Sequence, residues 1–137
     1  METRSAKQKH APVTVRVAFA ASSVASARQK LKTWMREQGC SRDVIEDGRL
    51  VISELVANSV RHAQPLSDGT ILITWARERR GIRISVTDGG STSRPRTVHA
   101  SASAVSGRGM AIVEAIAIDW WSEQTRSRST IHALLAD

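Results

Sequence analysis

The sequence predicts an α+β fold, a two-layer α/β sandwich in which three helices cover one face of a mixed, mainly antiparallel sheet. Three observations lead to this prediction. Segments with helical periodicity are separated from segments with strand-like alternation, and the later strands come in pairs joined by short turns. The 137 residues fit one domain with its own core, and no internal repeat or linker divides them.

The first half of the chain predicts one strand and two helices. VTVRVAFA alternates and is rich in β-branched residues, which is typical of a half-buried strand. Serines that can act as N-caps precede both helical segments, and a glycine ends the first of them. The predicted elements are a strand over 13–20, a helix from Ser22 or Ser23 to about Gln38, and a helix from Ser41 to His62 or Ala63.

The second half predicts two hairpins separated by one helix. TILITWARE and GIRISVTD form the first hairpin, with a tight turn at Arg80 and Gly81. A short apolar segment, MAIVEAIA, has helical spacing and follows a glycine-rich stretch. The predicted elements are strands over 70–78 and 81–88, a helix beginning at Gly109 or Met110, and strands over 118–124 and 129–136.

Charge and composition limit the possible partners and compartments. The formal net charge of +7 admits nucleic acids, anionic membranes and phosphorylated ligands. The arginines come in small groups, so we interpret most of them as solvated loop and strand residues. Cys40 is the only cysteine, which excludes an internal disulfide and favours a reducing compartment.

The chain has no sequence signal for a membrane or for secretion. No stretch reaches the roughly 18 apolar residues of a membrane helix, and the longest candidate, MAIVEAIAI, contains Glu114. Residues 1–11 are polar and basic with no apolar segment behind them, so we expect a flexible tail and no secretory signal. We therefore expect a cytoplasmic protein without membrane contact.

A polar stripe crosses the second predicted helix in the segment SELVANSVRHA. Glu54, Asn58 and His62 follow one another at intervals of four residues, which places them near one face of the helix. Glycines then cluster at 88–90 and 107–109, on either side of a polar loop without periodicity. Glycines in loops commonly make turns, but long loops are often functional, and together with the stripe they indicate a ligand site.

Three motifs in order carry a resemblance to a known family. SELVANSVRHA is similar to the N box, VTDGG to the first glycine box and GRGMAIV to the second glycine box of the GHKL ATP-binding fold, also called the Bergerat fold. Gyrases, ninety-kilodalton heat-shock chaperones, mismatch-repair proteins and histidine kinases share this fold. The compact length most resembles bacterial anti-sigma-factor serine/threonine kinases, and the resemblance runs from about Pro12 to the end of the sequence.

The resemblance implies one ATP-binding domain over 12–137, with ATP and Mg²⁺ held between the second helix and the loop before the third. Residues 91–106 would be the ATP lid. Asn58 matches the magnesium ligand, since an amide oxygen suits a hard cation without adding charge beside the phosphates. Glu54 matches the general base, or a carboxylate that orients water or has a structural role. Arg61 and His62 match a basic end of the same box, although His62 could equally cap the helix.

The remaining implied ligands follow the two glycine boxes and the last strand. Asp88 matches the aspartate that accepts a hydrogen bond from the adenine amino group, and Gly90 would let the purine lie against backbone. Thr130 matches a threonine that reaches adenine, while Ser129 replaces the glycine expected before it. In the second glycine box, free amides at a helix start and one arginine would bind phosphate; these residues are Gly107, Arg108, Gly109 and Met110.

The implied function is a serine/threonine kinase that binds MgATP, restrains a sigma factor and phosphorylates an anti-sigma-factor antagonist. The family analogy also suggests a homodimer that makes no direct contact with nucleic acid. An ATP-gated binding module without phosphoryl transfer is the alternative. A third hypothesis, a nucleic-acid binder that uses the arginines and four tryptophans, predicts strongly salt-dependent binding. The sequence contains no GxxxxGK loop and no GxSxG elbow that would favour other enzyme classes.

Overall fold

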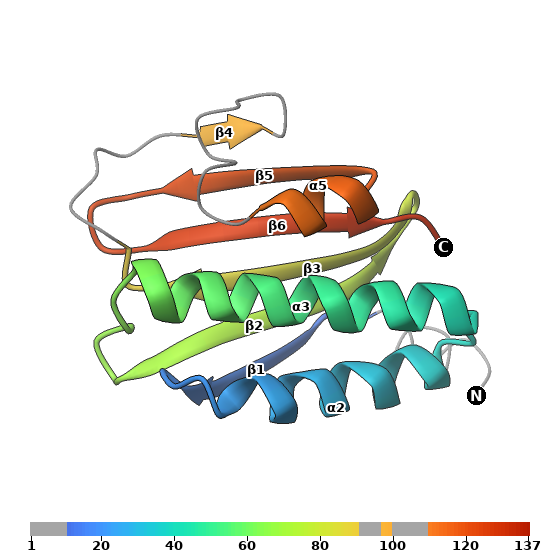
Figure 1. Ribbon diagram of the computed structural model, residues 1–137, viewed down its shortest axis with the longest axis horizontal. Coiled ribbons are helices and arrows are strands. Elements are labelled where there is room, and N and C mark those ends of the chain that lie inside the picture. The colour runs from blue at the N-terminus through green and yellow to red at the C-terminus, as the bar shows by residue number, and fades with distance from the viewer. Residues whose placement is uncertain (1–10, 91–96, 100–109) are drawn as a thin grey trace.

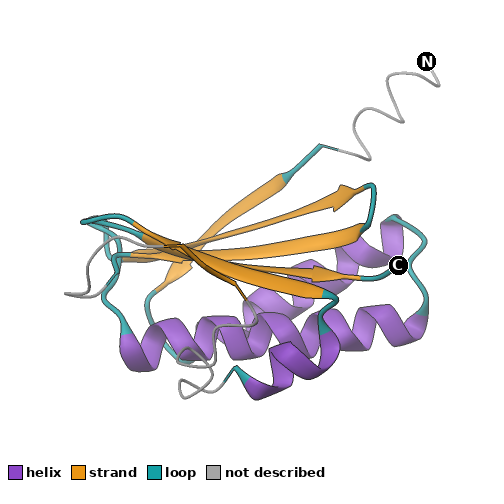
Figure 2. Ribbon diagram, turned by 90° about the horizontal axis from the view of Figure 1, so that it is seen from above, coloured by secondary structure: helices purple, strands orange, loops and turns teal. Residues whose placement is uncertain are grey.

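The fold is a six-stranded antiparallel sheet with three helices packed on one of its faces (Figures 1 and 2). The computed structural model describes residues 11–90, the backbone of 97–99, and residues 110–137. The strand order is β1-β2-β3-β6-β5-β4. The strands are β1 (Val13–Ala18), β2 (Thr70–Glu78), β3 (Gly81–Asp88), β4 (Thr97–His99), β5 (Asp119–Gln124) and β6 (Ser129–Leu135).

This architecture confirms the predicted α+β sandwich and changes two details of the sheet. Every strand pairing in the described part of the chain is antiparallel, so the expected mixed character is absent there. The short strand β4 lies within the segment predicted to be an irregular lid, and it pairs with the outer edge of β5. Three residues with no alternation pattern gave no strand signal in the sequence.

The helices begin and end close to the predicted positions. Ser41 caps α3, because its side chain accepts a hydrogen bond of 3.3 Å from the Val44 amide. Ser22 makes no such bond, and Ser23 donates instead to the Ala18 carbonyl at 2.7 Å, so the expected serine cap of the first helix is not formed. The helices are α2 (Ser23–Glu37), α3 (Arg42–His62) and α5 (Ala111–Ile116).

The core lies between the helical layer and the facing side of the sheet. In β3, Ile82, Ile84 and Val86 alternate toward the helices and are almost completely buried. In α3, Leu55 and Val51 face them with no exposed surface. This burial fixes α3 across the middle of the sheet, which determines where its polar residues can lie (Figure 1).

The opposite side of the sheet carries no helix in the described part of the chain (Figure 2). Polar side chains line a part of it. We call it the open face, defined by Thr74, Ser85, Thr87, Glu123, Thr130 and His132. His132 links two strands here, with Nδ1 2.7 Å from the Ser85 hydroxyl and Nε2 2.8 Å from a Glu123 carboxylate oxygen. Thr87 and Thr130 are joined by a hydrogen bond of 2.8 Å. Cross-strand pairs of this kind stabilise the sheet without a covering layer.

Within the described residues, no helix combines the length and the apolar character needed to span a membrane.

Two leucines of α3 provide a matched test of this packing. Leu55 has no exposed surface, whereas Leu50 is 50% exposed on the same helix. We expect Leu55→Ala to lower the free energy of unfolding by about 2–5 kcal/mol, because it leaves a cavity in the core. Leu50→Ala should change it by less than about 0.5 kcal/mol. Urea denaturation of both variants checks this, and equal midpoints would contradict the described packing.

Candidate functional site

The candidate site lies where the C-terminal half of α3 crosses the end of β3. Asn58 faces the interior with only 6% of its surface exposed. Its side-chain oxygen Oδ1 is buried and has no hydrogen-bond partner among the described residues. Since buried polar atoms are almost always paired in folded proteins, an unpaired amide oxygen here is a candidate ligand for a bound group.

Asp88, the last residue of β3, contacts Ser59, the residue that follows Asn58 in α3. The hydroxyl of Ser59 donates a hydrogen bond of 2.6 Å to Asp88 Oδ2. The amide of Gly90 donates one of 2.8 Å to Oδ1. Asp88 is 5% exposed and Ser59 1% exposed, so this pair joins the helix to the sheet inside the protein.

Burial dominates the electrostatics of Asp88. Desolvation raises the pKa of its carboxyl group above the ordinary value, while the hydrogen bonds from Ser59 and Gly90 oppose that shift. Among the described residues, no basic side chain contributes to the shift or forms an ion pair with this carboxylate. A carboxylate held in this way is a hydrogen-bond acceptor available to a neutral donor of a ligand.

The chain that leaves α3 is tied to the same corner. The Gly89 amide donates to the Gln64 carbonyl at 2.7 Å, and the Gln64 amide donates to the Gly90 carbonyl at 3.1 Å. A Cβ atom at Gly89 would lie 2.0 Å from the Pro65 carbonyl oxygen, so only glycine permits this approach. Gly90 has a left-handed φ of +79°, which glycine adopts without strain. The first glycine box therefore shapes the backbone around Asp88.

Strand register shows which residue of β6 accompanies Asp88. Asp88 pairs with Ser129, and Thr87 pairs with Thr130. Because paired residues project to the same face, Ser129 lies on the helix side with Asp88, while Thr130 lies on the open face. The hydrogen bond between Thr130 and Thr87 agrees with this placement. The structure therefore does not bring Thr130 to the site, and the hydroxyl next to Asp88 in the sheet belongs to Ser129.

The other predicted site residues differ in their burial and in the element that carries them. Glu54 is half-buried one helical turn before Asn58, while Arg61 and His62 are exposed in the last turn of α3. Met110, at the N-cap of α5, is fully buried. The positions Gly107, Arg108 and Gly109, and the predicted lid apart from the backbone of 97–99, lie outside the described residues.

The side chains present fit a site for a nucleotide and a magnesium ion. The described residues contain no cluster of three or more His, Cys, Asp or Glu side chains that could hold a metal. Mg²⁺ does not need such a cluster, because it is commonly held by one or two protein oxygens together with water and substrate phosphates. The unpaired oxygen of Asn58 has the chemistry of such a ligand. The carboxylate of Asp88 has the chemistry of a separate acceptor for a base or sugar.

Comparison with known proteins agrees with this fold. The family model of the histidine kinase-like ATPase domain matches residues 17–132. Among solved structures, the chain is similar to the RsbU and RsbW domains of Rv1364c from Mycobacterium tuberculosis, with a TM-score of 0.70 and 23% sequence identity. That match covers 93% of this chain and 33% of the other, so this chain spans about a third of the solved one. A comparison with curated proteins finds no match.

The chain belongs to the histidine kinase-like ATPase domain family, because the family model covers most of its length. This confirms the expected membership of the GHKL group. The similarity to the RsbU and RsbW structure shows the same fold.

Sequence reasoning missed Ser59 and Ser129. Ser59 follows Ile52 and Val56 on the apolar stripe of α3, at spacings of seven and three, so it had to be buried and to need a partner. That spacing was the available signal. In β6, alternation with Ile131 places Ser129 on the core side, which also could have been recognised.

Asp88→Asn tests the burial of this carboxylate. The amide keeps the shape but carries no charge. Its oxygen can accept from the Gly90 amide, while its NH₂ group would have to donate to the Ser59 hydroxyl, which reverses that hydrogen bond. Because the folded-state pKa of Asp88 is raised, the native protein loses stability as pH rises from about 3.9 through that raised value. We expect the variant to be more stable at pH 7, by a margin that disappears below pH about 3.9. Urea denaturation at several pH values measures the difference, and a constant margin would contradict the assignment.

Proposed function

We propose that this protein is an ATP-dependent serine/threonine protein kinase of the anti-sigma-factor type. One observation carries the proposal: an unpaired buried amide oxygen, at Asn58, lies one residue from the serine that holds the buried carboxylate of Asp88. Asn58 would supply a metal ligand from α3, and Asp88 would supply a hydrogen-bond acceptor for the base from the end of β3. Family membership supports the choice of ATP as the ligand.

Asp88 would select adenine. Its carboxylate accepts hydrogen bonds, and the exocyclic amino group of adenine is a donor, whereas guanine presents an oxygen at the same position. A hydrogen bond to a charged group of about 1.5–3 kcal/mol corresponds to about 10- to 150-fold in affinity. Ser129, on the same face, provides a hydroxyl beside the base.

Asn58 would hold the magnesium ion together with the phosphates. When bound, the ion neutralises charge on the triphosphate and so favours phosphoryl transfer. The neutral amide adds no negative charge next to the phosphates. The phosphates would also contact the amides and arginine at 107–109, and the basic side chains of Arg61 and His62 lie exposed at the end of α3.

Glu54 would act on the hydroxyl of the protein substrate. It lies one turn before Asn58 on the same helix, so both side chains can reach the region of the terminal phosphate. A carboxylate there can accept the proton of a serine or threonine hydroxyl as that oxygen forms its bond to phosphorus. Phosphoryl transfer needs mainly positioning and charge neutralisation, which these residues and the glycine boxes supply.

The partners follow from the family analogy. We propose a cytoplasmic homodimer that restrains a sigma factor and phosphorylates an anti-sigma-factor antagonist, with no direct nucleic-acid contact. Residues 12–137 would form one ATP-binding domain, and residues 91–106 would close over the bound nucleotide as its lid.

A second candidate is an ATP-gated binding module without phosphoryl transfer. No hydrogen bond or ion pair orients Glu54 among the described residues, and a general base is usually held by a partner. In this case ATP would order the region before α5 and change a partner-binding surface, while Glu54 would have no chemical role.

Calorimetric titration tests the nucleotide site. We expect ATP to bind more tightly than GTP, and Asp88→Asn to reduce ATP affinity by about 10- to 150-fold. Asn58→Ala should remove the effect of Mg²⁺ on affinity while leaving metal-free binding measurable. Ser129→Ala should weaken binding, whereas Thr130→Val, on the open face, serves as the control and should not. Equal affinities for ATP and GTP would refute the role of Asp88.

Transfer of labelled phosphate distinguishes the two candidate functions. With γ-labelled ATP and purified antagonist proteins, we expect phosphoserine or phosphothreonine on one of them. Glu54→Gln should lower the rate by about 10²–10⁴-fold while ATP affinity stays near that of the wild type. No labelled product, together with partner binding that responds to ATP and is unchanged in Glu54→Gln, would favour the gated module.

A further inference from the structure

Three polar residues form a row across the sheet at the end that carries the candidate site, and we call them the polar row. Asp88 of β3 pairs with Ser129 of β6, and Ser129 pairs with Gln124, the last residue of β5. Paired residues on neighbouring strands project to the same face of a sheet. Gln124 therefore lies on the helix side with Asp88. Glu123, the residue before it, projects to the open face, where it contacts His132.

The side chain of Gln124 contains a buried acceptor without a partner. Its Oε1 atom accepts no hydrogen bond within the described part of the chain. Buried side-chain oxygens are nearly always paired, because leaving one unpaired has a free-energy cost. The residue as a whole is partly exposed, so a ligand lying over the helix side of the sheet can reach its flexible amide. An acceptor in this position suits a donor that arrives with a ligand.

The location of a second unpaired oxygen supports this interpretation. Among the described residues, two buried side-chain oxygens lack a hydrogen-bond partner, Asn58 Oδ1 and Gln124 Oε1. Asn58 precedes Ser59, the residue that donates to Asp88. Gln124 pairs with Ser129, the strand partner of Asp88. Both unpaired oxygens are thus one residue removed from a direct neighbour of the same buried carboxylate, which indicates one shared ligand site.

Strand spacing indicates which part of a nucleotide Gln124 can contact. Asp88 and Gln124 are two strands apart, and with neighbouring strands about 4.8 Å apart their backbones are separated by about 10 Å. A single amino group is too small to bridge that separation, whereas a nucleoside can span it. Adenosine has hydrogen-bond donors at its amino group and at its ribose hydroxyls. With the amino group at Asp88, the donors that remain for Gln124 are the hydroxyls.

We propose that Gln124 determines the sugar specificity of the nucleotide site, by accepting a hydrogen bond from a ribose hydroxyl at its Oε1 atom. This inference rests on the proposed function, in which ATP binds with its base at Asp88. The polar row then recognises the nucleoside along its length, and the site distinguishes ribonucleotides from deoxyribonucleotides. The neutral amide accepts this bond without adding negative charge near the phosphates.

Calorimetric titration of the full chain with ATP, 2′-deoxyATP and 3′-deoxyATP tests the proposal. We expect the wild type to bind ATP about 2- to 12-fold more tightly than one of the two deoxy analogues. Gln124→Leu keeps the approximate size of the side chain but has no acceptor. It should weaken ATP binding by a similar factor and bind ATP and that analogue equally. Gln124→Glu retains an acceptor, so it should retain the preference for ATP.

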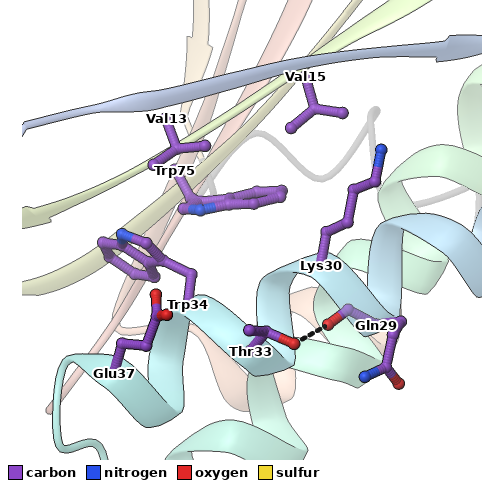
Figure 3. A pocket seen from close by; sticks show the side chains of 8 residues that line it. All are labelled: Val13, Val15, Gln29, Lys30, Thr33, Trp34, Glu37 and Trp75. Carbon is purple, nitrogen blue, oxygen red and sulfur yellow. Dashed lines mark hydrogen bonds between the residues drawn. The ribbon is translucent and has the colours of Figure 1, made fainter.

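A matched control and a stability measurement accompany the titration. Gln29→Leu makes the same change at an exposed position of α2, beside β1 at the opposite edge of the sheet (Figure 3), and should leave the affinities unchanged. Because Gln124 Oε1 makes no hydrogen bond in the nucleotide-free protein, Gln124→Leu should not lower the urea midpoint. A lower midpoint would assign Gln124 a structural role and contradict the proposal.

The outcomes separate this inference from the proposed function. Equal ATP affinities of Gln124→Leu and the wild type would overturn the inference, and so would a sugar preference that persists in Gln124→Leu. Equal binding of ATP and both analogues by the wild type would also overturn it. If Asp88→Asn still weakens ATP binding in these cases, the proposed function stands. A wild type that does not bind ATP would instead reject the proposed function, and this inference with it.

Discussion

The hydrogen bond from Ser59 to Asp88 is the constraint on which the candidate site depends. It connects helix α3 to the end of the central strand β3, between residues 29 positions apart in sequence. Asp88 would otherwise be a buried carboxylate with only one backbone amide as partner. Since an isolated buried charge is strongly unfavourable, the serine allows the aspartate to remain inside and still offer an acceptor to a ligand.

The same corner ties helix α3 to the end of strand β3. The segment after α3 exchanges two backbone hydrogen bonds with the glycines after β3, and Gly89 lies against the Pro65 carbonyl. These contacts hold the elements that carry Asn58 and Asp88 against each other. Side chains held in place before a ligand arrives avoid the free-energy cost of ordering them on binding.

The two faces of the sheet have different roles. The helical side holds the core and the candidate nucleotide site, whereas the open face is stabilised by cross-strand polar pairs such as Ser85 with His132.

The fold class, the family and every described helix and strand except β4 were predictable from the sequence, because periodicity and glycine motifs are local signals. The sequence also indicated Asn58 and Asp88 as candidate ligands. The contacts between side chains required the folded structure: Ser59 meets Asp88, and Ser129 rather than Thr130 lies on the helix side. Strand register and helix rotation fix those contacts, and one residue of register reverses the face to which a side chain points.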